Sequence, residues 1–144
     1  MKIIAKNKKA FFDFEILKKF MAGLILTGAE AKAIRAGMVN LKGSYVSTRN
    51  NQACIENMNI AAYQRTNQPD YEETRSRKLL LQAKEIEELT LASEKNGQTI
   101  VPLAIGFEGR FIKIEIAIAR GKKVYDKRES IKKRELDRSM KNFK

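Results

Sequence analysis

The chain of 144 residues carries 29 Lys and Arg against 17 Asp and Glu, and 43% of its residues are hydrophobic. These values predict one globular domain with an appendage and an acidic partner, with nucleic acid ahead of an anionic membrane surface. A single cysteine, Cys54, and no histidine exclude an intrachain disulfide, Cys- or His-ligated metal sites and Ser–His or Cys–His nucleophiles.

No uncharged run is long enough to cross a membrane, and the N-terminal residues lack the apolar core of a signal peptide. We therefore expect a cytoplasmic protein without metal or cofactor. Nothing in the sequence demands an assembly larger than a monomer when the protein is free.

The first half of the domain is predicted to contain short strands and one helix. Alternating apolar side chains predict a strand over Phe12 to Ile16, and a second, more buried strand covers Gly23 to Leu26. An Ala-rich helix follows from Ala29 to Arg35, and Gly37 ends it. Residues 44–48 and 53–60 are predicted to form a hairpin around Asn50-Asn51.

The second half is predicted to begin with a polar loop over residues 66–74 and a helix from about Lys84 to Lys95. Two strands, 99–107 and 110–119, then flank the turn Glu108-Gly109, and the isoleucines of the second strand share one face. About six antiparallel strands with two to three short helices predict a mainly β fold, a small OB-like barrel over residues 1–120.

Residues 121–144 form a basic C-terminal tail with ten Lys or Arg against four Asp or Glu. Leu136, Met140 and Phe143 fall on one narrow helical stripe. Three apolar side chains at about 1.5–3 kcal/mol each do not offset the backbone entropy of about 15 residues at 1–2 kcal/mol per residue. The tail is therefore expected to be disordered alone and helical only against a partner.

Basic clusters are spread along the predicted domain, and nearby tyrosines offer flat surfaces for unstacked bases. The clusters are Asn7-Lys8-Lys9, Lys18-Lys19, Arg75-Ser76-Arg77-Lys78, Lys113 and Gly121-Lys122-Lys123, with Tyr63, Tyr71 and Tyr125 as candidate stacking residues. A solvated charged surface is the alternative for each basic cluster, and a core position is the alternative for Tyr63, whereas Tyr71 is expected to be exposed in its polar loop. Glu30, a lone acid on the Ala-rich helix, has as its alternative an ion pair with Lys32 or Arg35.

The order and spacing of several segments resemble the small protein B (SmpB) family, the SsrA-binding proteins, along nearly the whole chain. The matching segments include Asn7-Lys8-Lys9-Ala10, residues 22–28, Glu30-Ala31-Lys32, Arg35-Ala36-Gly37, Ser44-Tyr45, residues 75–81, residues 97–103, Gly121-Lys122-Lys123 and Asp126-Lys127-Arg128. The resemblance implies a non-enzymatic OB-like protein that binds the tRNA-like domain of transfer-messenger RNA and delivers it to stalled ribosomes for trans-translation. It also implies that the tail enters the vacant mRNA channel and folds there.

The resemblance and the basic clusters together give two sets of site residues. The predicted RNA-binding set is Asn7, Lys8, Lys9, Glu30, Lys32, Arg35, Arg75, Arg77, Lys78, Leu80, Lys113, Lys122 and Lys123. The predicted ribosome-binding set lies in the tail and comprises Asp126, Lys127, Arg128, Lys132, Lys133, Arg134, Leu136, Met140 and Phe143.

The sequence departs from the family pattern at Met21, at Tyr71-Glu72-Glu73 in place of a His-Asp-Pro loop, and at Gln82. Two other functions stay open beside the resemblance. One is a generic OB-fold module that binds RNA or single strands or associates with the ribosome. The other is an enzyme on a barrel scaffold, for which no convergent acid–base pair is found.

Overall fold

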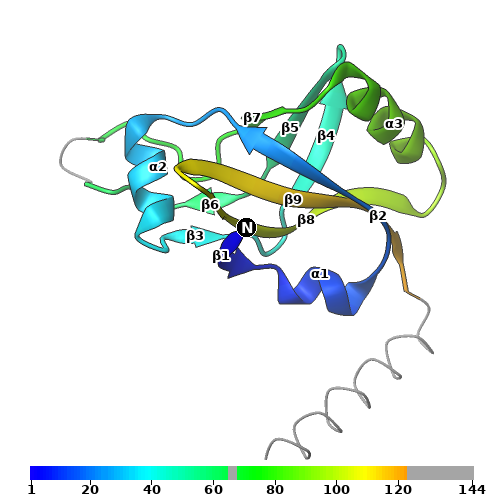
Figure 1. Ribbon diagram of the computed structural model, residues 1–144, viewed down its shortest axis with the longest axis horizontal. Coiled ribbons are helices and arrows are strands. Elements are labelled where there is room, and N and C mark those ends of the chain that lie inside the picture. Colours follow the sequence, from blue (N-terminus) through cyan, green and yellow to red (C-terminus); the bar gives the residue numbers. More distant parts are fainter. Residues whose placement is uncertain (65–67, 123–144) are drawn as a thin grey trace, which may run out of the picture.

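The computed structural model describes residues 1–64 and 68–122, which contain nine strands and three helices (Figure 1). The strands are β1 (Lys2–Lys6), β2 (Phe14–Leu24), β3 (Val39–Asn40), β4 (Tyr45–Arg49), β5 (Gln52–Glu56), β6 (Asn59–Ile60), β7 (Arg77–Leu80), β8 (Gln98–Glu108) and β9 (Phe111–Gly121). The helices are α1 (Lys8–Asp13), α2 (Gly28–Arg35) and α3 (Ala83–Ser93). The fold is mainly β, as predicted.

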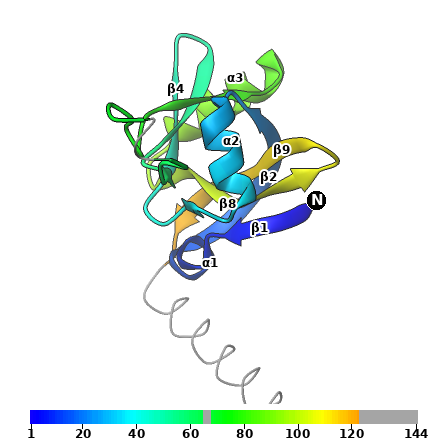
Figure 2. The same cartoon turned by 90° about the vertical axis from the view of Figure 1, so that its left-hand side faces the viewer.

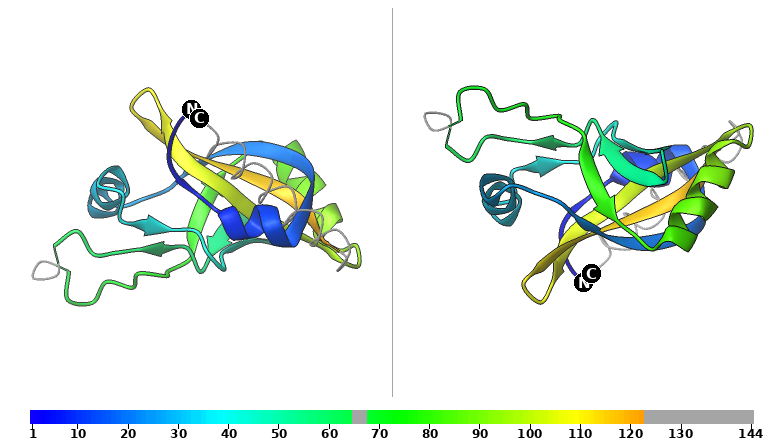
Figure 3. Two further views of the ribbon diagram at one scale, coloured as in Figure 1. Left: turned by 90° about the horizontal axis from the view of Figure 1, so that it is seen from below. Right: turned by 90° about the horizontal axis from the view of Figure 1, so that it is seen from above.

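Seven strands form one antiparallel sheet in the order β1-β8-β9-β2-β7-β5-β4, and β3 pairs with β6 separately. The sheet is strongly coiled, so that β4 comes into contact with β8. Figure 3 shows the cyan and green strands of one half crossing over the yellow and orange β8 and β9. Within the described ranges no ladder joins β4 to β8, so the sheet is OB-like in its coiling without being a closed barrel.

The main core lies inside this coil. Buried side chains from the long strands, among them Ile105, Ile114 and Ile116, meet Ile34 from α2 and Leu89 from α3. Figures 1 and 2 show α2 and α3 at opposite ends of the sheet. The isoleucines of β9 share the core face, as the alternation of that strand predicts.

The outer face of β8 and β9 is also covered at one end. Ala10 of α1 packs there on Leu103, Ala117 and Ala119 as a second small cluster. Both faces of the two strands are therefore buried at this point, one by the main core and the other by α1. The side chain of Asn7 starts that helix, because its Oδ1 accepts from the backbone N–H of Ala10 at 3.2 Å.

The first third of the chain differs from the prediction. The two strands expected at 12–16 and 23–26 are parts of one strand, β2, and residues 8–13 form α1. A register shift between Ile16 and Lys18 and the exposed lysines Lys18 and Lys19 interrupt the alternation on which strand prediction depends. The predicted helices appear within two residues of their expected bounds, as α2 and α3.

Candidate nucleic-acid interface

Helix α2 begins with a capping box that already involves Glu30. The hydroxyl of Thr27 accepts from the backbone N–H of Glu30 at 3.1 Å, and the Thr27 N–H donates to Glu30 Oε1 at 3.0 Å. The reciprocal bonds satisfy two N–H groups that a helix end would otherwise leave without partners. The cap also directs the carboxylate of Glu30 inward.

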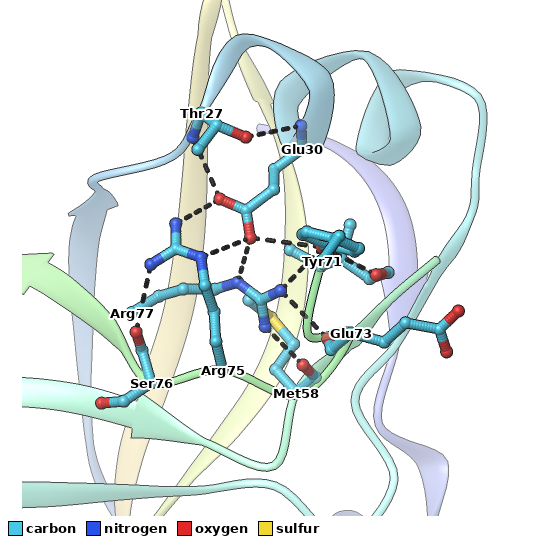
Figure 4. A network of polar contacts seen from close by, with 9 residues as sticks. Thr27, Glu30, Met58, Tyr71, Glu73, Arg75, Ser76 and Arg77 are labelled. Carbon is cyan, nitrogen blue, oxygen red and sulfur yellow. Dashed lines mark hydrogen bonds and ion pairs between the residues drawn. The ribbon is translucent and has the colours of Figure 1, made fainter. Parts of the chain in front are cut away.

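Glu30 is the centre of a buried ion cluster, shown in Figure 4. Its side chain is 1% exposed, and Arg77 Nε donates to Oε2 at 2.6 Å. Arg75 donates to Oε2 through Nε at 3.0 Å and to Oε1 through Nη2. The sequence alternative of an ion pair with Lys32 or Arg35 is therefore wrong: the partners come from β7 and the residues just before it.

The guanidinium of Arg77 is itself fully buried, and other groups use its remaining donors. Nη1 donates to the Met58 carbonyl at 2.6 Å, and Nη2 donates to the Glu73 carbonyl at 3.0 Å and to the Tyr71 hydroxyl at 2.9 Å. The Tyr71 hydroxyl in turn donates to the Ile60 carbonyl at 2.8 Å. The cluster therefore ties α2, β6, β7 and the 71–75 segment together.

The charges of the cluster are fixed over a wide pH range. Burial alone would raise the pKa of Glu30, but bonds from Arg75, the Thr27 backbone and Arg77 outweigh it and lower the pKa to about 2. Burial raises the pKa of Tyr71 above its usual 10.0. The carboxylate is therefore ionised and the phenol neutral at physiological pH.

A hollow of about 270 Å³, which we call the α2 groove, lies beside this cluster between α2, the ends of β2 and β7 and the tip of the β8–β9 hairpin. Its apolar lining includes Leu80, 54% exposed, and Phe111, 62% exposed. Gly23 allows Leu80 to lie across β2, because a Cβ at Gly23 would be only 3.3 Å from two atoms of Leu80. Exposed apolar surface of this kind is uncommon unless it binds something.

Three cations complete the α2 groove: Arg35 from α2, Arg110 from the hairpin tip and Lys113 from β9. Arg35 donates through Nη2 to the Arg110 carbonyl at 3.2 Å and lies 5.7 Å from the Phe107 ring centroid. Arg110 lies 5.8 Å from the centroid of Phe111. Cations around an exposed apolar and aromatic floor suit phosphates together with the flat faces of bases or riboses.

The predicted RNA-binding residues fall in three different places. Arg35, Leu80 and Lys113 line the α2 groove, and Lys32 and Lys78 are exposed on the adjoining α2 and β7. Lys8 and Lys9 are exposed on α1, and Lys122 donates through Nζ to the Phe11 carbonyl at the end of that helix. Arg75 is partly exposed over the buried cluster.

Asn7, Glu30 and Arg77 need correction as RNA-facing residues, because the structure buries their side chains. They hold other elements in position: Asn7 holds α1, and Glu30 and Arg77 hold α2. Lys123 and the whole predicted ribosome-binding set lie outside the described residues.

Sequence reasoning missed Gly23, Arg110 and Phe111 of the α2 groove. Phe111 carried a signal, since it is an apolar residue only two positions after Gly109 of the predicted turn, where solvent exposure is expected. Of the departures from the family pattern, Tyr71 and Glu73 belong to the ion cluster, Met21 is exposed on β2, and Gln82 caps α3.

None of the helices in the described ranges has the length and apolarity to cross a membrane. Across residues 1–64 and 68–122 no group of three or more His, Cys, Asp or Glu side chains is placed to hold a metal ion.

Comparison with known proteins gives a consistent match. The family model described as SmpB protein matches residues 4–144. An SsrA-binding protein from Acholeplasma laidlawii is 46% identical over 138 residues, which cover 96% of this chain and 93% of the relative. An SsrA-binding protein from Carboxydothermus hydrogenoformans is 44% identical over 139 residues, with the same two shares.

A solved structure is also similar, with a TM-score of 0.72 and 37% identity over 88% of this chain and 93% of the other. It is described as "tmRNA-SmpB: a journey to the center of the bacterial ribosome".

Proposed function

Because the chain belongs to the SmpB protein family, we propose that it is an SsrA-binding protein that binds the tRNA-like domain of transfer-messenger RNA. In this role it delivers the RNA to stalled ribosomes for trans-translation, as a cytoplasmic protein with no catalytic step of its own. The relatives named above are SsrA-binding proteins, and the description of the similar solved structure names tmRNA-SmpB and the bacterial ribosome.

The observation that carries the RNA-binding part of the proposal is the α2 groove. Arg35, Arg110 and Lys113 supply cations around the exposed Leu80 and Phe111, and none of the described residues that line the hollow is acidic. Basic side chains position an RNA by its phosphates, whereas apolar and aromatic groups contact its bases and riboses. The buried ion cluster fixes α2 and therefore the approach of Arg35.

We assign a second task to residues 121–144. With ten basic and four acidic residues, the tail suits a polyanionic host, and its Leu136, Met140 and Phe143 stripe suits helix formation against that host. Asp126, Lys127 and Arg128, together with Lys132, Lys133 and Arg134, are the proposed contacts to the ribosome. The folded domain and the tail then bind two different partners.

The groove is tested by binding of the full chain to the tRNA-like domain of transfer-messenger RNA across a salt series. The double variant Arg35→Gln and Lys113→Gln should bind more weakly and lower the slope of log affinity against log salt by about 1.8 in magnitude, at about 0.9 per phosphate. The matched control, Lys84→Gln and Lys95→Gln, removes the same charge from one exposed site in the first turn of α3 and one just after that helix. Equal losses in both variants would mean that only overall charge matters.

Elongator tRNA and an unstructured single strand serve as competitors in the same assay. A tenfold or greater preference for the tRNA-like domain, about 1.4 kcal/mol, is expected of an SsrA-binding protein. Equal affinity for all three RNAs would instead favour the generic single-strand-binding alternative.

A further inference from the structure

A second hollow lies away from the α2 groove, between α1, the 42–45 segment and β8. Its volume is about 610 Å³, and Ala10, Phe14 and Val101 give it an apolar lining. The ring of Tyr45, which is 44% exposed, forms part of its wall. Thr99 and Asp13 also lie in the lining and add a hydroxyl and a carboxylate to it.

The mouth of this cavity is strongly basic. An adjoining hollow is lined by Lys6, Asn7, Lys8, Lys9, Asn40 and Lys42, and it shares Asn7, Lys9 and Lys42 with the cavity. Among the residues that the structure describes, no Asp or Glu lines this adjoining hollow. Within the described part of the chain none of its four lysines forms an ion pair. Such a group of uncompensated cations attracts phosphates.

The buried side chain of Asn7 holds the lysines together. Its Nδ2 donates to the Leu41 carbonyl at 3.3 Å and to the Pro102 carbonyl at 3.0 Å, while Oδ1 accepts from the Ala10 N–H. These bonds fix the segment that carries Lys42 against α1 and β8. The basic mouth is therefore built by a buried contact and does not depend on flexible surface loops.

We propose that this cavity and its lysines, which we call the Tyr45 site, form a second RNA site that takes one unstacked base. The base lies against the ring of Tyr45 inside the apolar cavity, and Lys9, Lys42, Lys6 and Lys8 bind the phosphates on either side of it. Unstacked bases bind flat aromatic side chains, and their charged backbone requires cations close by. A duplex cannot present a base in this way, so the ligand is a single-stranded or bulged stretch of RNA.

The site is tested with the full chain and a short single-stranded oligouridine RNA that carries one central 2-aminopurine. Stacking on Tyr45 should quench the fluorescence of 2-aminopurine. Tyr45→Leu should abolish the quenching and weaken binding roughly tenfold or more, whereas Tyr45→Phe, which keeps the ring, should retain both. Thermal unfolding of each variant identifies any that is misfolded, and Tyr45→Phe tests the site even if Tyr45→Leu does not fold.

The phosphate contacts are tested by salt dependence. The variant Lys9→Gln with Lys42→Gln should lower the salt slope by about 1.4 in magnitude, at about 0.7 for each single-strand phosphate. Lys84→Gln with Lys95→Gln should leave it unchanged. Quenching that survives Tyr45→Leu, or equal slope changes in the two double variants, would overturn the proposal.

Two further measurements distinguish RNA from a free nucleotide as the ligand, and the Tyr45 site from the α2 groove as the place of binding. Adenosine monophosphate should compete only weakly, and tighter binding of this nucleotide than of the oligonucleotide would overturn the assignment to RNA. Arg35→Gln with Lys113→Gln should keep the quenching intact. Loss of the quenching in that variant would show that the probe occupies the α2 groove and would overturn a separate Tyr45 site, without bearing on the proposed binding of the tRNA-like domain.

Discussion

The buried carboxylate of Glu30 neutralises two guanidinium groups, those of Arg75 and Arg77. Replacing it by glutamine leaves Arg77, which is fully buried, without an anion, while the amide keeps nearly the same shape. Removing one partner of a buried pair costs about 3–5 kcal/mol. We expect Glu30→Gln to lower the free energy of unfolding by about 3 kcal/mol in urea titrations, because Arg75 is partly exposed and can reorient toward solvent.

The control for this change is Glu87→Gln, which alters an exposed acid on α3 and should shift the unfolding free energy by less than about 0.5 kcal/mol. Similar effects of the two substitutions would contradict the assigned role of the cluster.

The same carboxylate makes stability depend on pH in the acid range. Its pKa falls from an ordinary 4.5 to about 2 on folding, so the stabilisation is complete above pH 4.5 and disappears as the pH falls toward 2. A shift of this size corresponds to about 3 kcal/mol. The difference in unfolding free energy between the wild type and Glu30→Gln should therefore shrink between about pH 5 and pH 2. A difference that stays constant over this interval would show that the charge of Glu30 is not what stabilises the cluster.

At the scale of the elements, Gly106 shows how closely β1 approaches β8. A Cβ at this position would lie 2.2 Å from the backbone oxygen of Lys2, a contact that only movement of β1 can relieve. Gly106→Ala should detach or shift β1, visible as faster amide exchange over residues 2–6 and a lower unfolding temperature. Gly121→Ala, where a Cβ meets nothing within 4 Å, is the matched strand control. Unchanged exchange in Gly106→Ala would contradict this packing.

How well each element could be predicted depended on how regular its sequence pattern is. The β8–β9 hairpin and α3 have unbroken patterns and clear turn residues, and they appear close to their expected positions. In β2 the register shift after Ile16 and the exposed lysines interrupt the apolar alternation, so the sequence predicts two strands where the structure has one. Helix α1 is only six residues long, and its cap, Asn7, depends on contacts with residues 41 and 102 that no local pattern contains.

The residues of the candidate site also differ in how well the sequence predicts their positions. The exposed Arg35 and Leu80 and the half-buried Lys113 were identified through the family resemblance, and they line one groove. The burial of Glu30 and Arg77 could not be predicted, because their pairing joins positions 47 residues apart. A charged residue in a sequence looks the same whether it faces solvent or a buried partner.

At the scale of the whole molecule, the charge divides between the folded domain and the tail. The chain carries a net +12, of which +6 lies in residues 121–144. The described fold ends with Lys122, whose backbone N–H donates to the Asp13 carbonyl at 3.0 Å. The described residues that line the α2 groove and the Tyr45 site all belong to the folded domain. Binding of RNA by the domain is therefore expected to be independent of the tail.

Deleting residues 126–144 should leave the affinity for the tRNA-like domain within about threefold of the full chain, since long-range charge effects are largely screened at physiological salt. The same deletion should abolish tagging of incomplete proteins on stalled ribosomes in a reconstituted translation assay. A variant with the sequence of residues 126–144 scrambled keeps the tail's charge but disperses Leu136, Met140 and Phe143. It should fail in tagging as the deletion does, because charge alone does not form the apolar helical stripe. Full tagging by the truncated chain would refute the division of tasks, and full tagging by the scrambled chain would reduce the tail to a source of positive charge.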